Sequence, residues 1–402
     1  MKRSGQADLP LHYGHVPAWL HQRMAKLGGA IMEAIAEDYG RAEILRRLSD
    51  PLWFQSFGAV LGMDWHSSGI TTSVMGALKK AINPLSAELG IYICGGRGKH
   101  SRKTPAELLS IAEKTGQDAH PLIRASRLSA KIDNTAIQDG FQIYLHNFIL
   151  SSDGEWAVVQ QGMNNQNGMA RRYHWLSSSL KSFTEEPHTA VCGTNQGLML
   201  NLTHHQAQPT QAGILKIATS NTAYMQNEAR KIIMPRYHDV RREDVNLKRL
   251  GSILALAHEQ QPSGFDDLLL IHGLGPRTLQ SLTLVSEVIH GTPSRFSDPA
   301  RYSFAHGGKD GHPFPVPLKV YDQSINVLRT AVDRAKIGYS DKKEALRKLH
   351  QVSQRQEKNF TPDPAQFERV IEKERSESYR YGGRTVFGKA RPMAGKQLGL
   401  FD

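Results

Sequence analysis

FQIYLHNFILSSDGEWAVVQQGM, residues 141–163, is the stretch that decides the fold, because it combines two strand-forming runs with a turn. Residues 141–150 and 155–160 are rich in aromatic and β-branched side chains, which pack well on a pleated sheet. Ser152-Asp153-Gly154 separates the two runs, and Asp-Gly favours the tight turns that join antiparallel strands. The sequence therefore predicts an antiparallel hairpin within a domain that mixes helices and sheet.

Helices and a further strand are predicted on either side of this hairpin. The apolar spacing predicts helices over 19–39 and 68–80, and GIYICGG over 90–96 predicts a strand. We expect an α+β protein with five parts: an α+β domain with an antiparallel sheet over 1–205, which would hold the catalytic site, a helical connector over 206–260, an all-helical domain over 261–345, a flexible, basic and partly disordered tail over 346–396, and a short peptide over 397–402.

Composition narrows the class of protein. The chain has 402 residues, 39% of them hydrophobic, which is enough to bury a substantial core. Two cysteines are too few for a disulfide framework, and the sequence shows neither a signal peptide nor a run of about 18 apolar residues, which indicates a cytoplasmic protein without a membrane span. The 50 Lys and Arg exceed the 38 Asp and Glu, giving a net charge of +12. This charge favours nucleic acid as a partner and a nucleoid-associated location, although it can also serve solubility alone.

The clearest nucleic-acid motif is GFDDLLLIHGLGPRTLQSL, residues 264–282. An apolar helix leads into two glycines that permit a tight turn, and Pro276 suits the first turn of a second helix, whose free N–H groups would face an anion. The pattern resembles the helix-hairpin-helix motif, which implies contacts to a DNA backbone without sequence readout. The resemblance assigns these contacts to Gly273, Gly275, Arg277 and Thr278. The alternative is an ordinary helical corner.

A second resemblance lies in the last residues of the chain. Gln397-Leu398-Gly399-Leu400-Phe401 looks like the peptide by which bacterial repair and replication proteins bind the sliding clamp. Apolar anchors on a flexible basic tail suit an extended docking peptide. The resemblance implies the sliding clamp as a partner, bound by Gln397, Leu398, Leu400 and Phe401. Alternatively, Leu400 and Phe401 pack back on the domain.

Two short motifs in the first hundred or so residues carry candidate chemistry. Asp64 and His66, in MDWHSSG, place a carboxylate and an imidazole two residues apart, which suits a metal or acid–base site. The loop after the predicted strand, CGGRGKHSRKT over 94–104, joins glycines to several cations. It lacks Walker A spacing, so we expect phosphate contacts from Lys99, Arg102 and Lys103 without nucleotide hydrolysis, or else a solvated basic loop.

Polar residues also flank the hairpin. Asp133 and Asp139 precede it, Gln160 ends its second strand, and Arg171 and Arg172 follow. Metal-dependent nucleases hold Mg²⁺ with carboxylates on adjacent strands and place a cation near the scissile phosphate. Gln160-Gln161 departs from the Glu and Lys expected there, so this patch can alternatively read a base edge. We expect Arg171 and Arg172 to contact DNA.

Asp298 supports a different enzyme. In helix-hairpin-helix DNA glycosylases a catalytic Asp follows the hairpin by about twenty residues, and Asp298 stands 21 positions after Arg277. The missing lysine at position 277 argues against a lyase, and a helix-capping role for Asp298-Pro299 needs no chemistry. Lys309, in FAHGGKDGH, is a further predicted DNA contact.

Taken together, the sequence resembles a prokaryotic family known only as domain of unknown function number seven hundred and sixty-three. The resemblance covers residues 1 to about 345 and rests on RSGQADLPLH, LRRLSDPLWFQ, DWHSSGITT, GGRGKHSRKTP, QQGMN, RRYHW and FAHGGKDG. It supplies no reaction and no catalytic residues.

The residues favour a DNA repair or replication enzyme, a metal-dependent nuclease that hydrolyses phosphodiester bonds and is recruited by the clamp. We expect Mg²⁺ or Mn²⁺ bound by Asp64 and Asp139, and catalytic roles for Asp64, His66, Asp133, Asp139 and Gln160. The alternatives are a glycosylase using Asp298, a non-catalytic DNA-binding adaptor, and an enzyme of RNA processing.

Overall fold

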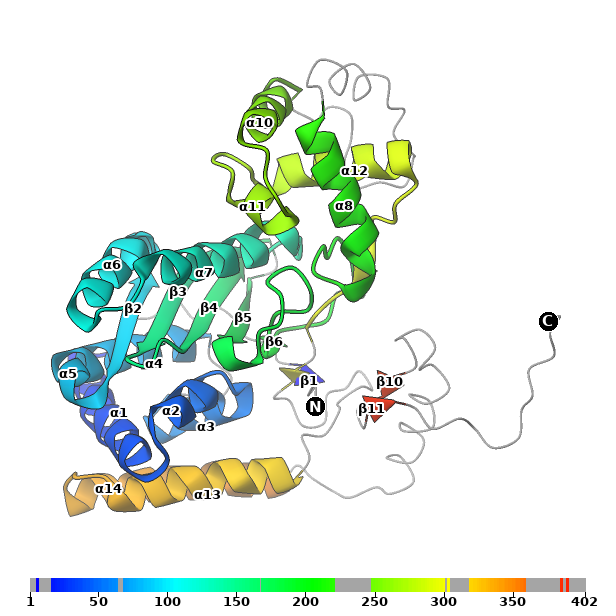
Figure 1. The fold of residues 1–402 in the computed structure, drawn as a ribbon. Helices are drawn as coiled ribbons and strands as arrows, with labels where there is room; N and C mark the ends of the chain where they lie inside the picture. Colours follow the sequence, from blue (N-terminus) through cyan, green and yellow to red (C-terminus); the bar gives the residue numbers. More distant parts are fainter. Residues whose placement is uncertain are drawn as a thin grey trace.

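The fold has three layers, with a mostly antiparallel sheet between two layers of helices (Figure 1). The computed structural model describes residues 5–6, 16–63, 68–166, 168–220, 247–300, 302–303, 318–358, 384–385 and 388–389. The predicted α+β class is therefore confirmed. None of the helices in these ranges is long and apolar enough to span a membrane.

The predicted hairpin forms the centre of the sheet. Strands β3 (Gln142–Ser151) and β4 (Trp156–Asn164) pair antiparallel, with His146 opposite Gln160. The sheet order is β1-β9-β6-β5-β4-β3-β2, antiparallel from β2 to β6, with β1 and β9 added in parallel at one edge. The remaining strands of this sheet are β1 (Gly5–Gln6), β2 (Ile91–Arg97), β5 (Met169–Leu176), β6 (Ala190–Cys192) and β9 (Tyr302–Ser303).

The first face of the sheet packs against helices from the middle of the chain. Alternate strand residues, such as Phe148, Val158 and Trp175, belong to one buried cluster that continues into these helices. They are α6 (Thr104–Thr115), α7 (Ala119–Lys131), α8 (Gln208–Thr219), α10 (Leu247–Gln260), α11 (Phe265–Leu270) and α12 (Pro276–His290). A π-helical turn, η3 (Ile132–Ala136), follows α7. The predicted connector and helical domain thus share one core with the sheet.

The second face carries the alternating partners of those residues, including Ile93, Ile149 and Val159. They pack against α1 (Ala18–Tyr39), α2 (Arg41–Leu48), α3 (Pro51–Val60), α4 (Gly69–Ile82), α13 (Leu318–Arg334) and α14 (Tyr339–Lys358). Both faces are covered, so successive residues are buried on both sides of the sheet over 145–151 of β3 and 156–162 of β4.

Helices α13 and α14 change the predicted division of the chain. Ala331 and Val332 of α13, and Leu349 of α14, are buried in the same cluster as α1 and α3. From Ile325 onward, α13 therefore packs with the N-terminal helices and not with the helical domain predicted over 261–345, and so does α14. Residues 346–358, placed in the predicted tail, complete α14.

The described residues also form one short α-helix, four two-residue strands and four 3₁₀ turns. They are α5 (Ser86–Leu89), β7 (Leu198–Met199), β8 (Phe296–Ser297), β10 (Arg384–Thr385), β11 (Gly388–Lys389) and the 3₁₀ turns η1 (Asn83–Leu85), η2 (Gly98–Lys103), η4 (Ser177–Ser179) and η5 (His205–Ala207).

Candidate nucleic-acid interface

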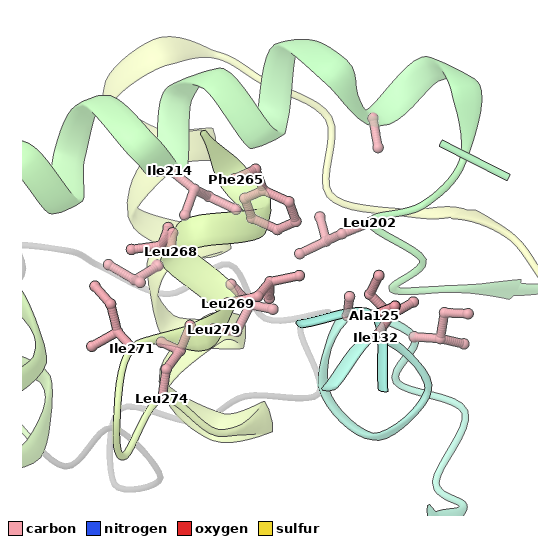
Figure 2. Close-up of a cluster of buried hydrophobic side chains, with 14 of the residues drawn as sticks. Ala125, Ile132, Leu202, Ile214, Phe265, Leu268, Leu269, Ile271, Leu274 and Leu279 are labelled. Atoms are coloured by element: carbon pink, nitrogen blue, oxygen red, sulfur yellow. The ribbon is translucent and has the colours of Figure 1, made fainter. Parts of the chain in front are cut away.

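A tight turn, Ile271–Gly275, joins α11 to α12 where the sequence predicted a DNA-binding hairpin. Ile271 and Leu274 are buried in the hydrophobic cluster beneath it, together with Leu268 and Leu279 (Figure 2). Gly273 has φ +85°, in the left-handed region that side chains other than glycine rarely adopt. The two apolar residues therefore anchor the turn from below, and the glycine lets the chain reverse between them.

The outer side of the turn is polar and accessible. Pro276 begins α12, and the residue at the N-cap position, Gly275, has no side chain that could cap the helix. The first N–H groups of a helix have no partner within the helix, and the positive end of the helix dipole lies there. Arg277 is exposed beside them, whereas the side chain of Thr278 is buried. The end of α12 can thus accept a phosphate from its backbone N–H groups and from Arg277.

Polar contacts tie this turn to α7 and to the loop that follows η3. Lys131 Nζ donates to the carbonyl oxygen of Leu274 at 2.6 Å, and Gln138 Nε2 donates to that of Pro276 at 2.8 Å. Arg124 binds Asp266 and Asp267 at the start of α11, with N–O distances of 2.7 and 2.6 Å. These contacts fix the turn relative to the end of α7. Burial lowers the pKa of Lys131.

A row of basic side chains runs along α7 toward the turn, and none of them was among the predicted DNA contacts. His120, Arg124, Arg127 and Lys131 are spaced four, three and four residues apart, which puts them on one face of a helix. The opposite face of α7, with Leu122, Ser126 and Ser129, is buried against the sheet. The sequence contains this spacing, but it does not tell which face of the helix is exposed; that depends on how α7 packs on the sheet.

The predicted basic loop lies at the end of β2. Lys99, Arg102 and Lys103 are exposed in η2, as phosphate contacts require. The preceding residue of the strand, Arg97, lies over the ring of Tyr144, 5.8 Å from its centroid. The three lysine and arginine side chains are thus available at this end of the sheet.

Ser68, of the MDWHSSG motif, lies at the same end of the sheet. Asp64 and His66 lie outside the described residues, but Ser68, which follows them, is described. The carbonyl oxygen of Ser68 accepts a hydrogen bond from Gln161 Nε2 at 3.1 Å, and the same amide donates to Tyr144 Oη at 2.6 Å. Because Arg97 lies over Tyr144, Ser68 and the start of the basic loop are linked through Tyr144 and Gln161 at the end of the sheet where β2 ends and β3 begins.

Comparison with known families adds one finding. A family model described as a protein of unknown function (DUF763) matches residues 5–316. The chain belongs to the DUF763 family. No curated protein and no solved structure matches it. The DUF763 match includes α7, the basic loop and the turn between α11 and α12, and it ends before α13.

The remaining predicted residues that the structure describes in this DUF763 protein lie in the interior. Arg171 donates to Asp139 Oδ2 at 2.9 Å and to both carboxylate oxygens of Asp298, and all three side chains are fully buried. Tyr173 Oη also donates to Asp139, at 2.5 Å, and Phe141 N donates to its other oxygen. Burial raises the pKa of Asp139, while Arg171 and Tyr173 act to lower it. This cluster joins β5 to the loop before β3 and to the segment after β8.

The two carboxylates of this cluster do not fit their predicted chemistry. Both oxygens of Asp139 already accept hydrogen bonds, one of them from a guanidinium that a metal ion would have to displace. Asp298 also accepts from the backbone N–H groups of Gln196 and Ala300, so its burial and bonding are those of a structural residue. In the described part of the chain, no group of three or more His, Cys, Asp or Glu side chains is arranged to hold a metal ion.

Asp133 and Gln160 belong to a second buried network, on the first face of the sheet. Gln160 Nε2 donates to Asp133 and to the Ser129 carbonyl, so its oxygen accepts from His146 Nδ1, 2.8 Å away. His146 Nε2 then accepts from the Ser126 hydroxyl at 2.9 Å. Trp175 and His188 complete the shell of Asp133. Burial lowers the pKa of His146, in accord with a neutral imidazole.

Arg172 points to the opposite face of the sheet and is also buried. It lies over the ring of Phe54, 4.7 Å from its centroid, and its Nε donates to His174 Nε2 at 2.9 Å. Burial lowers the pKa of Arg172. The prediction that Arg171 and Arg172 contact DNA is therefore corrected: adjacent residues of a central strand point to opposite faces, and here helices or loops cover both.

Three groups of predicted residues lie outside the described part of the chain. They are the Asp64 and His66 pair, Lys309, and the clamp-binding residues Gln397, Leu398, Leu400 and Phe401. Their assignments remain predictions.

Proposed function

We propose that this protein binds the sugar–phosphate backbone of DNA through the turn between α11 and α12. The observation that carries the proposal is the start of α12, where the N-cap residue is Gly275, beside the exposed Arg277 and held in place by the Lys131–Leu274 hydrogen bond. Backbone N–H groups and a guanidinium suit phosphate oxygens and do not distinguish bases. The net charge of +12 supports the same partner.

We further propose that the protein hydrolyses phosphodiester bonds in DNA repair or replication, at the end of the sheet where β2 ends and β3 begins. Asp64 and His66 would supply a carboxylate and an imidazole for acid–base chemistry, and Lys99, Arg102 and Lys103 would neutralise the phosphate. The contacts Ser68–Gln161–Tyr144 and Arg97–Tyr144 support this pairing, since they link Ser68, four residues after Asp64, to the residue that precedes the basic loop. Mg²⁺ or Mn²⁺ would stabilise charge on the phosphate, with Asp64 as the proposed ligand; Asp139 is not part of this proposal.

The sliding clamp is the proposed protein partner. The support is the pattern Gln397-Leu398-Gly399-Leu400-Phe401 in the sequence. A synthetic peptide of residues 391–402 should bind purified clamp, and replacing both Leu400 and Phe401 by Ala should abolish binding. Equal binding by the altered peptide would reject this partner.

Cleavage assays test the proposed reaction. Labelled single-stranded, duplex, flapped, mismatched and uracil-containing DNA would be incubated with the full chain and Mg²⁺, Mn²⁺ or chelator, then analysed with and without alkali. We expect strand breaks that need metal, and we expect Asp64→Asn to lose them while it still binds DNA. Asp153→Asn, at an exposed carboxylate in the hairpin turn, is the matched control.

Two outcomes would reject hydrolysis of the backbone. Breaks that appear only after alkali and survive chelator would establish a glycosylase. Tight binding without breaks on any substrate would establish a DNA-binding adaptor. If the DNA is left intact and the corresponding RNA substrates are cut, the substrate class in the proposal is wrong.

A further inference from the structure

We infer that the outward face of α7 is a second phosphate-binding element. It would bind the same DNA strand as the α11–α12 turn and so extend that DNA site. The inference rests on the proposed DNA binding. The face consists of His120, Arg124, Arg127 and Lys131, called here the α7 basic row. Its occupant would be the sugar–phosphate backbone of DNA, bound without sequence readout.

Continuity with the turn is the first reason. Lys131, the last member of the α7 basic row, donates to the Leu274 carbonyl inside the turn at 2.6 Å. Arg124, one turn of helix further back than Arg127, is joined to the start of α11 by its ion pairs with Asp266 and Asp267. The α7 basic row therefore runs beside α11 and ends at the turn, so a strand bound at the end of α12 would next meet Lys131 and Arg127.

Charge balance is the second reason. Two carboxylates already neutralise Arg124, whereas Arg127 is exposed and forms no ion pair with any described residue. Lys131 donates one hydrogen bond to the Leu274 carbonyl, which is neutral, so that contact does not neutralise its positive charge. The end of the α7 basic row nearest the turn thus keeps two cationic side chains.

Length is the third reason. From His120 to Lys131 the helix rises by about 16 Å, at about 1.5 Å per residue. One strand of B-DNA carries a phosphate every 3.4 Å or so along the axis, so this face spans roughly five phosphates. Its charge remains unneutralised only from Arg127 to Lys131, a rise of about 6 Å, so we expect the α7 basic row to add about two phosphates to those held at the start of α12.

Binding of a fluorescent duplex of random sequence to the full chain, measured by anisotropy over a series of salt concentrations, tests the inference. The variants are Arg127→Gln, Arg127→Glu, and Arg127→Gln combined with Lys131→Gln. The control combines Lys80→Gln with Lys114→Gln, which removes two positive charges from exposed side chains on α4 and α6. Arg277→Gln reports on the turn itself.

We expect Arg127→Gln to weaken binding about 3- to 10-fold at 0.1 M salt or so, and Arg127→Glu to weaken it more. A plot of log affinity against log salt has a negative slope, and its magnitude should decrease by about 0.9 for each phosphate that the variant no longer neutralises. The decrease for the double variant should therefore be about twice that for Arg127→Gln. The control should keep the wild-type slope.

The outcomes separate this inference from the proposal on which it rests. If Arg277→Gln weakens binding and the Arg127 variants match the control, the α7 inference is wrong and the proposed DNA binding stands. If the wild-type chain binds no duplex or single-stranded DNA at low salt, the proposed function fails and the inference fails with it. Loss of binding in both sets, with a smaller salt slope for the Arg127 variants, supports both.

Discussion

Arg171 binds both carboxylate oxygens of Asp298, at 3.1 and 2.8 Å, although the two residues are 127 positions apart in the sequence. The same guanidinium binds Asp139 and the carbonyl oxygen of Thr194. Burial alone would lower the pKa of Arg171, but Asp139 and Asp298 raise it, so the guanidinium stays charged. One buried cation thus holds together the loop before β3, the loop after β6 and the segment after β8.

Replacing Asp298 should therefore destabilise the fold. Asp298→Ala removes one of two buried carboxylates from a buried guanidinium and leaves two backbone N–H groups without an acceptor, so we expect a loss of about 3 kcal/mol in the free energy of unfolding. Urea denaturation measures it. Glu37→Ala, in an exposed ion pair with Lys336, should change stability by less than about 1 kcal/mol. An equal effect of the two variants would show that the buried pair does not stabilise the protein.

The sequence predicted the hairpin correctly because the signals for it are local. Residues 141–163 contain their own strand-forming runs and their own turn, and the family motifs around them extend the sheet. Arg171 and Arg172 were misassigned for the opposite reason. Two adjacent arginines in a predicted strand suggest a basic surface. Both are buried, because helices and loops from distant segments of the chain cover the two faces of the sheet.

The turn between α11 and α12 could be predicted from the sequence, whereas the α7 basic row could not. Gly273 and Gly275 mark the turn within a few residues, so its position could be predicted. The spacing of Arg124, Arg127 and Lys131 is also local, but which face of α7 is outward depends on the sheet beneath it. The meeting of Ser68 with Gln161 depends on strand register and was likewise beyond the sequence.

Stability should fall as the pH drops below the ordinary range of histidine. Burial, and then the Arg172 guanidinium, hold the pKa of His174 well below its usual value, and burial also lowers that of His146. A folded-state pKa below the unfolded value of about 6.5 gives stability that is present above that pH and is lost as the pH falls. Each histidine contributes at most about 1.4 kcal/mol per pH unit, until the pH reaches its folded-state pKa.

Urea denaturation between pH 5 and pH 8 checks this dependence. His174→Gln should be less stable than the wild type at pH 8, because Arg172 loses the imidazole to which it donates. Below about pH 6.5, however, the free energy of unfolding of the variant should decrease less steeply than that of the wild type, by about 1.4 kcal/mol per pH unit. An unchanged slope would mean that His174 is not neutral in the folded protein.

Asp139 and Asp64 should differ in cleavage assays. Asp139→Asn keeps an oxygen that can accept from Tyr173, Phe141 or Arg171, and Arg171 keeps Asp298, so we expect the variant to fold and to retain metal-dependent cleavage. Asp64→Asn should lose cleavage. Titration of Mn²⁺ in the same assay would show whether Asp139→Asn shifts the metal requirement. A large shift, with the fold intact by circular dichroism, would restore Asp139 as a metal ligand.

Gly273 offers a test of the turn with a control on the same helix. Gly273→Ala puts a side chain at φ +85°, which costs about 1–2 kcal/mol, and its Cβ would lie 3.4 Å from Ile253 Cδ1. Gly291→Ala at the other end of α12 has φ +66° and no atom within 4 Å of the new Cβ, so it should cost a similar amount of stability. Only Gly273→Ala should also weaken DNA binding, because it distorts the turn that presents the end of α12. Anisotropy with duplex DNA measures the difference, and equal binding by the two variants would separate the turn from the DNA site.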